Sequence, residues 1–332
     1  FREIVVLERK LRKNRHGEIA PKKDLRPYAE IPGVYVPSLY PLKKSMSRIV
    51  VDEQKASDAN LPFPIKRTIV DDLENFALPD HPLVPNTSIV HDRLTAEISR
   101  GCDQGCRFCH ASVYYRPQRE RSVKTLINWI LNNIASSGYS EVSLASLSSG
   151  DFSGIEALTQ ILIRQLEPTK VGLSFPSLRV NRLNANLAEA IATIRKTGFT
   201  VAPEAGTQRL RNIINKNISE EEIIQGVLSA FAAGWNLIKL YFMIGLPTEI
   251  EDDVTGIVDL VRRVRQIKGA NGRKPNIRVN ISTLIPKAHT PFQWVAQSPE
   301  EDLSAKHDIL KRGIRKAESK LSWHDPQVSL LE

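Results

Sequence analysis

The spacing of apolar and polar residues changes near residue 91. Before that point the pattern is irregular. After it, short apolar runs alternate with stretches of helical periodicity, which predicts strands alternating with helices. We expect six strands, at residues 95–99, 141–147, 170–175, 200–202, 236–244 and 276–285, and helices at residues 123–134, 154–166, 186–197, 208–215, 219–233, 249–266 and 300–321.

Strand–helix units in succession predict parallel strands joined by right-handed crossovers. Six units rather than eight predict an α/β fold of the partial (β/α)6 TIM-type barrel, with an irregular N-terminal extension and a C-terminal helix. In such folds ligands bind at the C-terminal ends of the strands. We therefore expect the functional residues directly after the strands.

The N-terminal extension is rich in proline, which argues against long helices and central strands. Only short strands, near residues 47–51 and 64–70, are predicted there. The resulting domains are a connector (1–90), a core (91–297) and a C-terminal helical segment (298–332). Because the chain begins with Phe1 and opens within a pattern, we expect a fragment whose connector ends a missing upstream domain.

The composition predicts the cellular compartment and shows a basic segment near the N-terminus, here called the basic arm. An apolar fraction of 41% and a charged fraction of 25% are typical of soluble globular proteins. Neither an apolar run of the ~18–20 residues that span a membrane nor a signal peptide is evident, so we expect a cytoplasmic protein without a membrane partner. The net charge is +9, and residues 2–26 hold nine basic and four acidic side chains. This arm could bind RNA phosphates or be a solvated linker.

All three cysteines of the chain, Cys102, Cys106 and Cys109, lie in one C-x3-C-x2-C segment. Three thiolates on one short loop can hold a soft metal centre and leave one coordination position open. Since the chain has no fourth cysteine, a cubane cluster would take its last ligand from elsewhere. Gly101 and Gly105 would let the loop fold tightly around such a cluster.

Other interpretations of the cysteines remain open. His110 follows Cys109 directly and could complete a Cys3His zinc site. Three inert buried thiols are a further alternative, although inert cysteines follow packing rather than loop spacing. A disulfide framework is the weakest alternative, because the cysteine count is odd.

Polar residues and glycines also follow the other strands. A glycine with a carboxylate suits a ligand ammonium, a glutamate can bind ribose hydroxyls, and an arginine can bind a carboxylate through two hydrogen bonds. The alternatives are a helix N-cap for the aspartate and an exposed salt bridge for the Glu-x4-Arg pair. In strand order, the candidates are Ser148, Ser149, Gly150 and Asp151, then Ser177, then Glu204 and Arg209, then Gly245, with Lys287, His289 and Trp294 as substrate-facing candidates after the sixth strand.

The cysteine segment resembles the cluster loop of the radical SAM superfamily. Residues 100–122, 203–211, 239–247 and 286–294 are similar to its cobalamin-associated branch, and the resemblance extends over roughly residues 28–332. It implies a [4Fe-4S] cluster on the three cysteines, with the fourth iron chelated by the amino and carboxylate groups of S-adenosylmethionine (SAM). The cluster then donates an electron that cleaves SAM to a 5′-deoxyadenosyl radical. The Ser148–Asp151 segment departs from the usual Gly-Gly-Glu of the family.

The same resemblance implies that the candidates from Ser148 to Gly245 bind SAM. It further implies an electron donor such as flavodoxin or ferredoxin, and cobalamin through the missing upstream domain. The substrate is unknown, with RNA and protein both represented among relatives. The absence of further cysteines argues against a methylthiotransferase, which needs a second cluster. The alternative function is a non-enzymatic zinc or iron–sulfur module that docks RNA through the basic arm.

Overall fold

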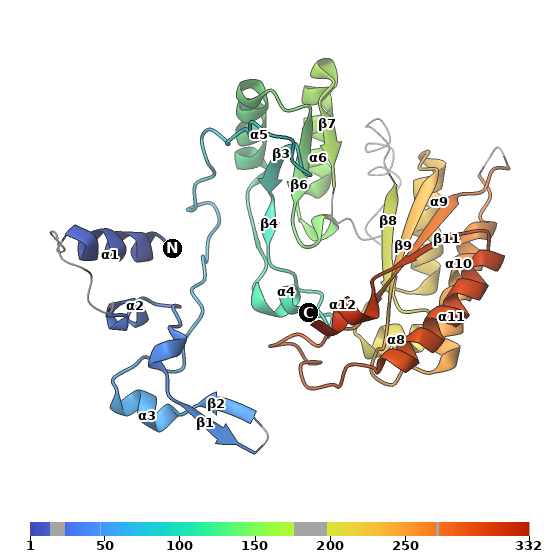
Figure 1. Ribbon diagram of the computed structural model, residues 1–332. Helices are drawn as coiled ribbons and strands as arrows, with labels where there is room; N and C mark the ends of the chain where they lie inside the picture. The colour runs from blue at the N-terminus through green and yellow to red at the C-terminus, as the bar shows by residue number, and fades with distance from the viewer. Residues whose placement is uncertain (14–23, 47, 176–197, 270–271, 332) are drawn as a thin grey trace. The chain divides into compact units, whose positions relative to one another are not determined.

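The computed structural model describes residues 1–13, 24–46, 48–175, 198–269 and 272–331. These residues divide into two compact units, Phe1–Asp71 and Asp72–Glu332. Figure 1 colours the chain from the first unit in blue to the end of the second in red. The domain boundaries at residues 90 and 297 stay predictions.

The first unit is built from short elements around a small core, in which Tyr28, Tyr40 and Ala56 are buried. Its helix α1 was not predicted; the helix forms ahead of the first proline, with Ile4 and Leu7 half-buried. The strand predicted at 64–70 is wrong, because these residues are irregular. The elements are α1 (Arg2–Lys13), α2 (Arg26–Ala29), the 3-10 helix η1 (Pro37–Leu39), the antiparallel pair β1 (Leu42–Ser45) and β2 (Arg48–Val51), and α3 (Glu53–Asp58).

The second unit begins with a parallel three-stranded sheet of order β3-β6-β7. Helices α5 and α6 pack on one face of this sheet through a cluster of buried aliphatic side chains. The hydroxyl of Ser122 caps α5 by accepting a hydrogen bond from the Thr125 amide at 3.1 Å. The elements are β3 (Leu94–Glu97), α5 (Val123–Ser137), β6 (Glu141–Ala145), the 3-10 helices η2 (Ser149–Asp151) and η3 (Glu167–Thr169), α6 (Ile155–Leu166) and β7 (Gly172–Ser174).

A second parallel sheet of order β11-β10-β9-β8 follows. Helices α9, α10 and α11 cover one of its faces (Figure 1) and bury against it the largest apolar cluster among the described residues. The elements are β8 (Phe199–Glu204), α8 (Gln208–Ile213), α9 (Glu220–Ala232), β9 (Leu237–Ile244), α10 (Glu251–Gln266), β10 (Asn276–Thr283), α11 (Glu300–Lys316), β11 (Lys320–Trp323) and α12 (Pro326–Leu331).

The predicted α/β class with parallel strands is confirmed, and no closed barrel forms among the described residues. Two details differ from the prediction. The last long helix ends at Lys316 rather than residue 321, and β11 adds a strand beside β10. The helix predicted at 186–197 lies outside the described residues. In the part of the chain that the structure describes, no helix has the length and apolar character needed to cross a membrane.

Candidate functional site

The three cysteines lie on the loop between β4 (Ser99–Arg100), which pairs antiparallel with β5 (Arg119–Glu120), and the short helix α4 (His110–Tyr114). Cys102 and Cys106 are buried, and Cys109 is partly exposed at the N-cap position of α4. The Cys109 amide donates to the Cys106 carbonyl at 3.1 Å, and the Ser112 hydroxyl donates to the Cys109 carbonyl at 2.9 Å. The last two cysteines therefore sit in one closed turn.

The start of this loop requires glycine. Gly101 has a φ of +93°, and a Cβ there would lie 2.5 Å from the Tyr115 carbonyl oxygen and 2.6 Å from that of Pro117. Gly105 also has a positive φ, +69°. The structure thus supports the expectation that both glycines let the loop turn tightly.

The cysteine loop is fastened to the residues that follow α8. The Asn215 side-chain amide donates to the Gly105 carbonyl at 2.8 Å and to the Gln104 carbonyl at 3.4 Å. The Arg107 amide donates to the Ile214 carbonyl at 2.9 Å. Sequence reasoning missed Asn215; its φ of +54° is a conformation that asparagine tolerates better than most residues.

The loop is also joined to the segment after β6. The Gln104 side-chain amide donates to the Asp151 carboxylate at 2.7 Å, and the Gln118 side-chain amide donates to the Asp151 backbone carbonyl at 3.4 Å. Helix α6 begins later, with Gly154 as its N-cap, so the Asp151 carboxylate does not cap that helix. The structure therefore brings Asp151 to the cysteine loop.

The two serines before Gly150 and Asp151 differ. The Ser149 hydroxyl donates to the Leu144 carbonyl at 3.1 Å and is fully buried. Ser148 is 5% exposed, and its hydroxyl has no hydrogen-bond partner among the described residues. Since buried hydroxyls normally have a partner, Ser148 is the better candidate of the two for contact with a bound molecule.

Glu204 ends β8 with a φ of +69°. Such a conformation costs a residue with a side chain about 1–2 kcal/mol. Its carboxylate lies 3.2 Å from the Lys216 ammonium, and both side chains are mostly buried. Glu204 is thus held on the same connection that carries Asn215.

Arg209 does not share a partner with Glu204 in the structure. Its guanidinium pairs with the buried Asp253 carboxylate and donates to the Thr248 carbonyl at 2.9 Å. Burial alone would raise the pKa of Asp253, but hydrogen bonds from Thr207, the Ile250 amide and Arg209 outweigh it and lower that pKa. Contact between Arg209 and SAM stays a prediction.

Gly245 and Ser177 are two further candidates for contact with SAM. Gly245 follows β9 with a φ of +77°, and its amide donates to the Glu249 carboxylate at 3.0 Å. Ser177 lies outside the described residues. No observation tests the role of either in binding SAM.

Aromatic rings lie beside the cysteine loop. The His110 ring stacks on Tyr114 with centroids 5.2 Å apart, and the His289 ring lies 6.1 Å from His110. Phe108 packs on an apolar cluster that includes Met243 and Phe292. Helix α4 and the loops after β9 and β10 therefore meet near the cysteines.

The donor set fits a cubane cluster. A zinc ion needs its ligands to converge at ~2.0–2.3 Å. Among the described residues, no three histidine, cysteine or acidic side chains are gathered closely enough to hold one metal ion. In a cubane each cysteine binds a different iron, so three separated thiols on a glycine-containing loop fit that group.

The geometry defines an α/β protein with three thiols on the loop after its first core strand, hydrogen-bonded to the segment after β6 and to the residues that follow α8. The Radical SAM superfamily model matches residues 96–261, half of the chain, and the chain belongs to this superfamily. Enzymes of the superfamily use a [4Fe-4S] cluster and SAM. The chain therefore carries the core of a radical SAM enzyme with these cofactors.

Among curated proteins, the chain is 35% identical over 222 residues to an uncharacterized protein of Methanocaldococcus jannaschii, covering 66% of this chain and 46% of that one. It is 25% identical over 188 residues to a tRNA-2-methylthio-N(6)-dimethylallyladenosine synthase of Desulforamulus reducens, covering 52% and 40%. The chain thus spans less than half the length of these relatives.

Solved structures resemble the chain more distantly. The radical SAM methyltransferase TsrM from Kitasatospora setae, with cobalamin and a [4Fe-4S] cluster bound, has 13% identity and a TM-score of 0.49 over 60% of this chain and 36% of that one. Coproporphyrinogen III oxidase HemN from Escherichia coli has 13% identity and a TM-score of 0.45 over 67% and 51%.

Proposed function

We propose that Cys102, Cys106 and Cys109 bind a [4Fe-4S] cluster and that the protein reductively cleaves SAM to a 5′-deoxyadenosyl radical, which abstracts hydrogen from a substrate. The cluster supplies one electron when bound and leaves one iron for the amino and carboxylate groups of SAM. One observation carries the proposal: hydrogen bonds from Gln104 and Asn215 join the cysteine loop to the segments after β6 and β8. Of the predicted SAM contacts, Ser148 to Asp151 lie in the first of these segments, and Glu204 and Arg209 lie on the connection that carries Asn215.

Each segment then has a role in holding SAM. The Ser148 hydroxyl and the Asp151 carboxylate would accept from the methionine ammonium. The Glu204 carboxylate would accept from the ribose hydroxyls while Lys216 holds it in place. Gly245 would let the adenine approach the backbone, and Arg209 would reach the methionine carboxylate only by exchanging its present partner, Asp253.

Burial of the loop protects the cluster. Cys102 and Cys106 are 8% and 7% exposed, and Phe108, between Cys106 and Cys109, packs on the apolar cluster that includes Met243 and Phe292. Limited water access would slow loss of iron and quenching of the radical. Cys109, at the exposed end of the loop, is the cysteine through which solvent would reach the cluster first.

Cobalamin, the electron donor and the substrate are proposals for the full-length protein. The resemblance to the cobalamin-associated branch makes cobalamin, held by a further domain, a candidate cofactor. Flavodoxin or ferredoxin would supply the electron. The name of the tRNA-modifying relative makes RNA one candidate substrate class. Reconstitution of the full-length protein with hydroxocobalamin, followed by absorbance spectroscopy, tests the corrinoid.

The cluster assignment is tested by anaerobic reconstitution. The unsubstituted protein should bind about four irons per chain and release 5′-deoxyadenosine from SAM under reducing conditions. Cys106→Ala should lose the cluster, because two thiolates cannot hold a cubane. The matched control is His110→Ala, which should keep it.

The opposite results would support the non-enzymatic alternative. Stoichiometric zinc, its loss in His110→Ala, and no cleavage of SAM would indicate a Cys3His zinc module. A full iron complement in Cys106→Ala would contradict the ligand assignment.

A further inference from the structure

The sheet formed by β8 to β11 has one apolar and one polar face. Side chains alternate along each strand, and those facing the helices, such as Leu240 and Val279, belong to the apolar cluster. The opposite face, here called the inner face, is half-buried or exposed over most of its length. It carries Thr200 on β8, Lys239 and Tyr241 on β9, Arg278, Asn280 and Ser282 on β10, and Lys320 and Ser322 on β11.

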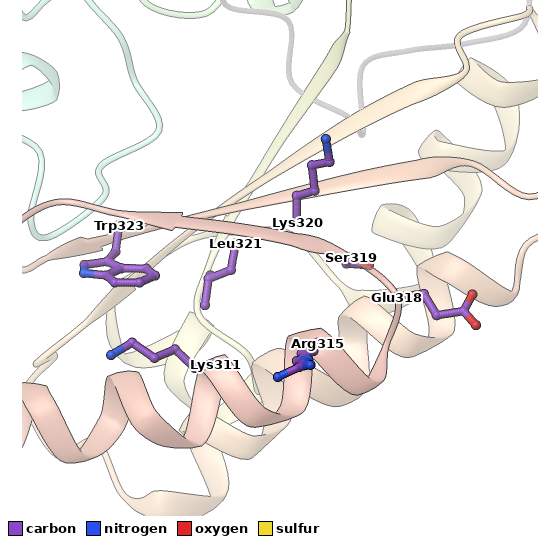
Figure 2. A pocket seen from close by; sticks show the side chains of 7 residues that line it. All are labelled: Lys311, Arg315, Glu318, Ser319, Lys320, Leu321 and Trp323. Carbon is purple, nitrogen blue, oxygen red and sulfur yellow. The ribbon is translucent and has the colours of Figure 1, made fainter.

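Three cations form one row across this inner face. In the parallel register Arg278 lies opposite Lys239 on one side and opposite Lys320 on the other. Figure 2 shows Lys320 and Leu321 leaving β11 in opposite directions, with Leu321 directed toward α11 and Lys320 away from it. Since neighbouring strands are about 4.8 Å apart, the row spans about 10 Å.

Such a row opposes sheet stability, because like charges directly opposite each other repel. Among the described residues, none of the three cations forms an ion pair. The inner-face carboxylate at the end of β8, Glu204, is already paired with Lys216. The sequence of residues 176–197 holds four basic side chains and one acidic one, so it adds no net negative charge.

An aromatic ring lies one step along the strands from the cations, toward the end that holds the cysteine loop. Tyr241 is 37% exposed and lies in register with Asn280 on β10. Two residues along a strand correspond to about 6.6 Å. A molecule held at its phosphates by the cation row could therefore stack a planar ring on Tyr241 and extend toward the site of hydrogen abstraction.

We propose that the inner face binds a single-stranded nucleic acid, with neighbouring phosphates on Lys239, Arg278 and Lys320 and a base on Tyr241. This inference rests on the proposed function, since it makes the nucleic acid the substrate of the radical. The three cations lie in a line, so a chain of phosphodiesters can give each of them its own phosphate. Groove cations with a stacking aromatic are the usual means of binding single strands.

Binding is measured by fluorescence anisotropy of labelled oligouridylate and oligothymidylate at several salt concentrations, with cluster-free protein. The test variant combines Lys239→Gln, Arg278→Gln and Lys320→Gln. Each lost phosphate contact should reduce the slope of log K against log salt by about 0.7, so the slope should fall by about 2. Affinity at low salt should fall at least about tenfold.

The matched control removes three other exposed cations, through Lys268→Gln, Arg312→Gln and Lys316→Gln. It lowers the net charge equally and should leave the slope unchanged. Tyr241→Ala should weaken binding about tenfold, and Tyr241→Phe should not. The row variant should unfold at the same or a higher temperature, since it removes repulsion rather than a contact.

Several results would overturn the inference: no binding of either oligonucleotide, equal losses in the row and control variants, equally tight binding of ADP, or equally tight binding of polyglutamate. The last two would assign the row to a small phosphorylated molecule or to an acidic protein. The failure of the radical proposal would be seen separately, because the unsubstituted, reconstituted protein would then release no 5′-deoxyadenosine from SAM, whatever its affinity for the oligonucleotides.

Discussion

Replacing Asn215 tests whether the connection between the cysteine loop and the segment after α8 stabilises the cluster. The Asn215 amide donates at 2.8 Å to the Gly105 carbonyl, a hydrogen bond worth about 1 kcal/mol. The second contact, at 3.4 Å to Gln104, is long and adds little. Asn215→Gly removes the donor, which lowers the stability of the unit, but glycine also adopts the left-handed backbone conformation without strain, which raises it. The two effects partly cancel in the free energy of unfolding of the whole unit.

The closed form of the cysteine loop loses the hydrogen bond without any compensating gain in stability. A loss of about 1 kcal/mol in the closed form of the loop should speed cluster loss about fivefold. Asn215→Asp should act more strongly, because a carboxylate would face two carbonyl oxygens in place of a donor. The assay follows transfer of iron from the anaerobically reconstituted protein to a chelator, by the absorbance of the iron–chelator complex.

The matched control is Asn60→Gly. Asn60 has a φ of +53°, close to that of Asn215, and lies in the first unit. It should leave the rate of iron loss unchanged. Equal rates in Asn215→Gly and Asn60→Gly, together with an unchanged rate in Asn215→Asp, would refute the idea that this hydrogen bond supports the cluster.

Three other predictions concern packing, pH and the SAM site. Gly206→Ala should lower the free energy of unfolding in urea by about 3 kcal/mol, since its Cβ would lie 2.3 Å from a backbone nitrogen of α10. Gly138→Ala, whose Cβ would have nothing within 4 Å, should lower it by only about 1 kcal/mol; equal losses would contradict this reasoning. Burial lowers the pKa of His307 in the folded protein, so below about pH 6.5 this imidazole takes up a proton in the unfolded chain before it does so in the folded one, and the free energy of unfolding declines. An equal decline in His307→Gln would exclude His307 as the cause. Glu204→Gln should raise the Kd for SAM about tenfold by weakening a charge-assisted hydrogen bond. Lys216→Met, which removes the ammonium that holds this carboxylate, should raise the Kd by a smaller factor; an unchanged Kd in Glu204→Gln would remove Glu204 from the site.

Local signals in the sequence predicted most of the fold of the second unit. The capping residue Ser122 placed the start of α5 at Val123, and the buried run of β9 was predicted within one residue of its start. The strand β11 was missed for a physical reason. It has four residues after a long helix, and its pairing with β10, some 40 residues earlier in the chain, defines it.

The candidate site was predicted less completely, because its contacts are long-range. Spacing alone identified the three cysteines. The alternative for Glu204 and Arg209 was a salt bridge between the two, but Asp253, 44 residues after Arg209, takes the guanidinium in the structure. The hydrogen bond between Asn215 and Gly105 joins residues 110 positions apart, so no local pattern in the sequence predicts it.

Backbone strain gives an independent indication of where the site lies. Glu204, Thr248 and His289 all have positive φ, of +69°, +62° and +64°, and they end or follow β8, β9 and β10. None is a glycine or asparagine, so each conformation costs about 1–2 kcal/mol. Met46, Lys170 and Glu318 adopt it in turns elsewhere, whereas these three end or follow adjacent strands of one sheet. Such strain persists where surrounding structure fixes a side chain for function. Because the three strands are parallel neighbours, their strained ends share one edge of the sheet, and the inner-face row of cations runs below that same edge. A nucleic acid bound along the strands would therefore extend from the row of cations to the strand ends that carry Glu204, Thr248 and His289.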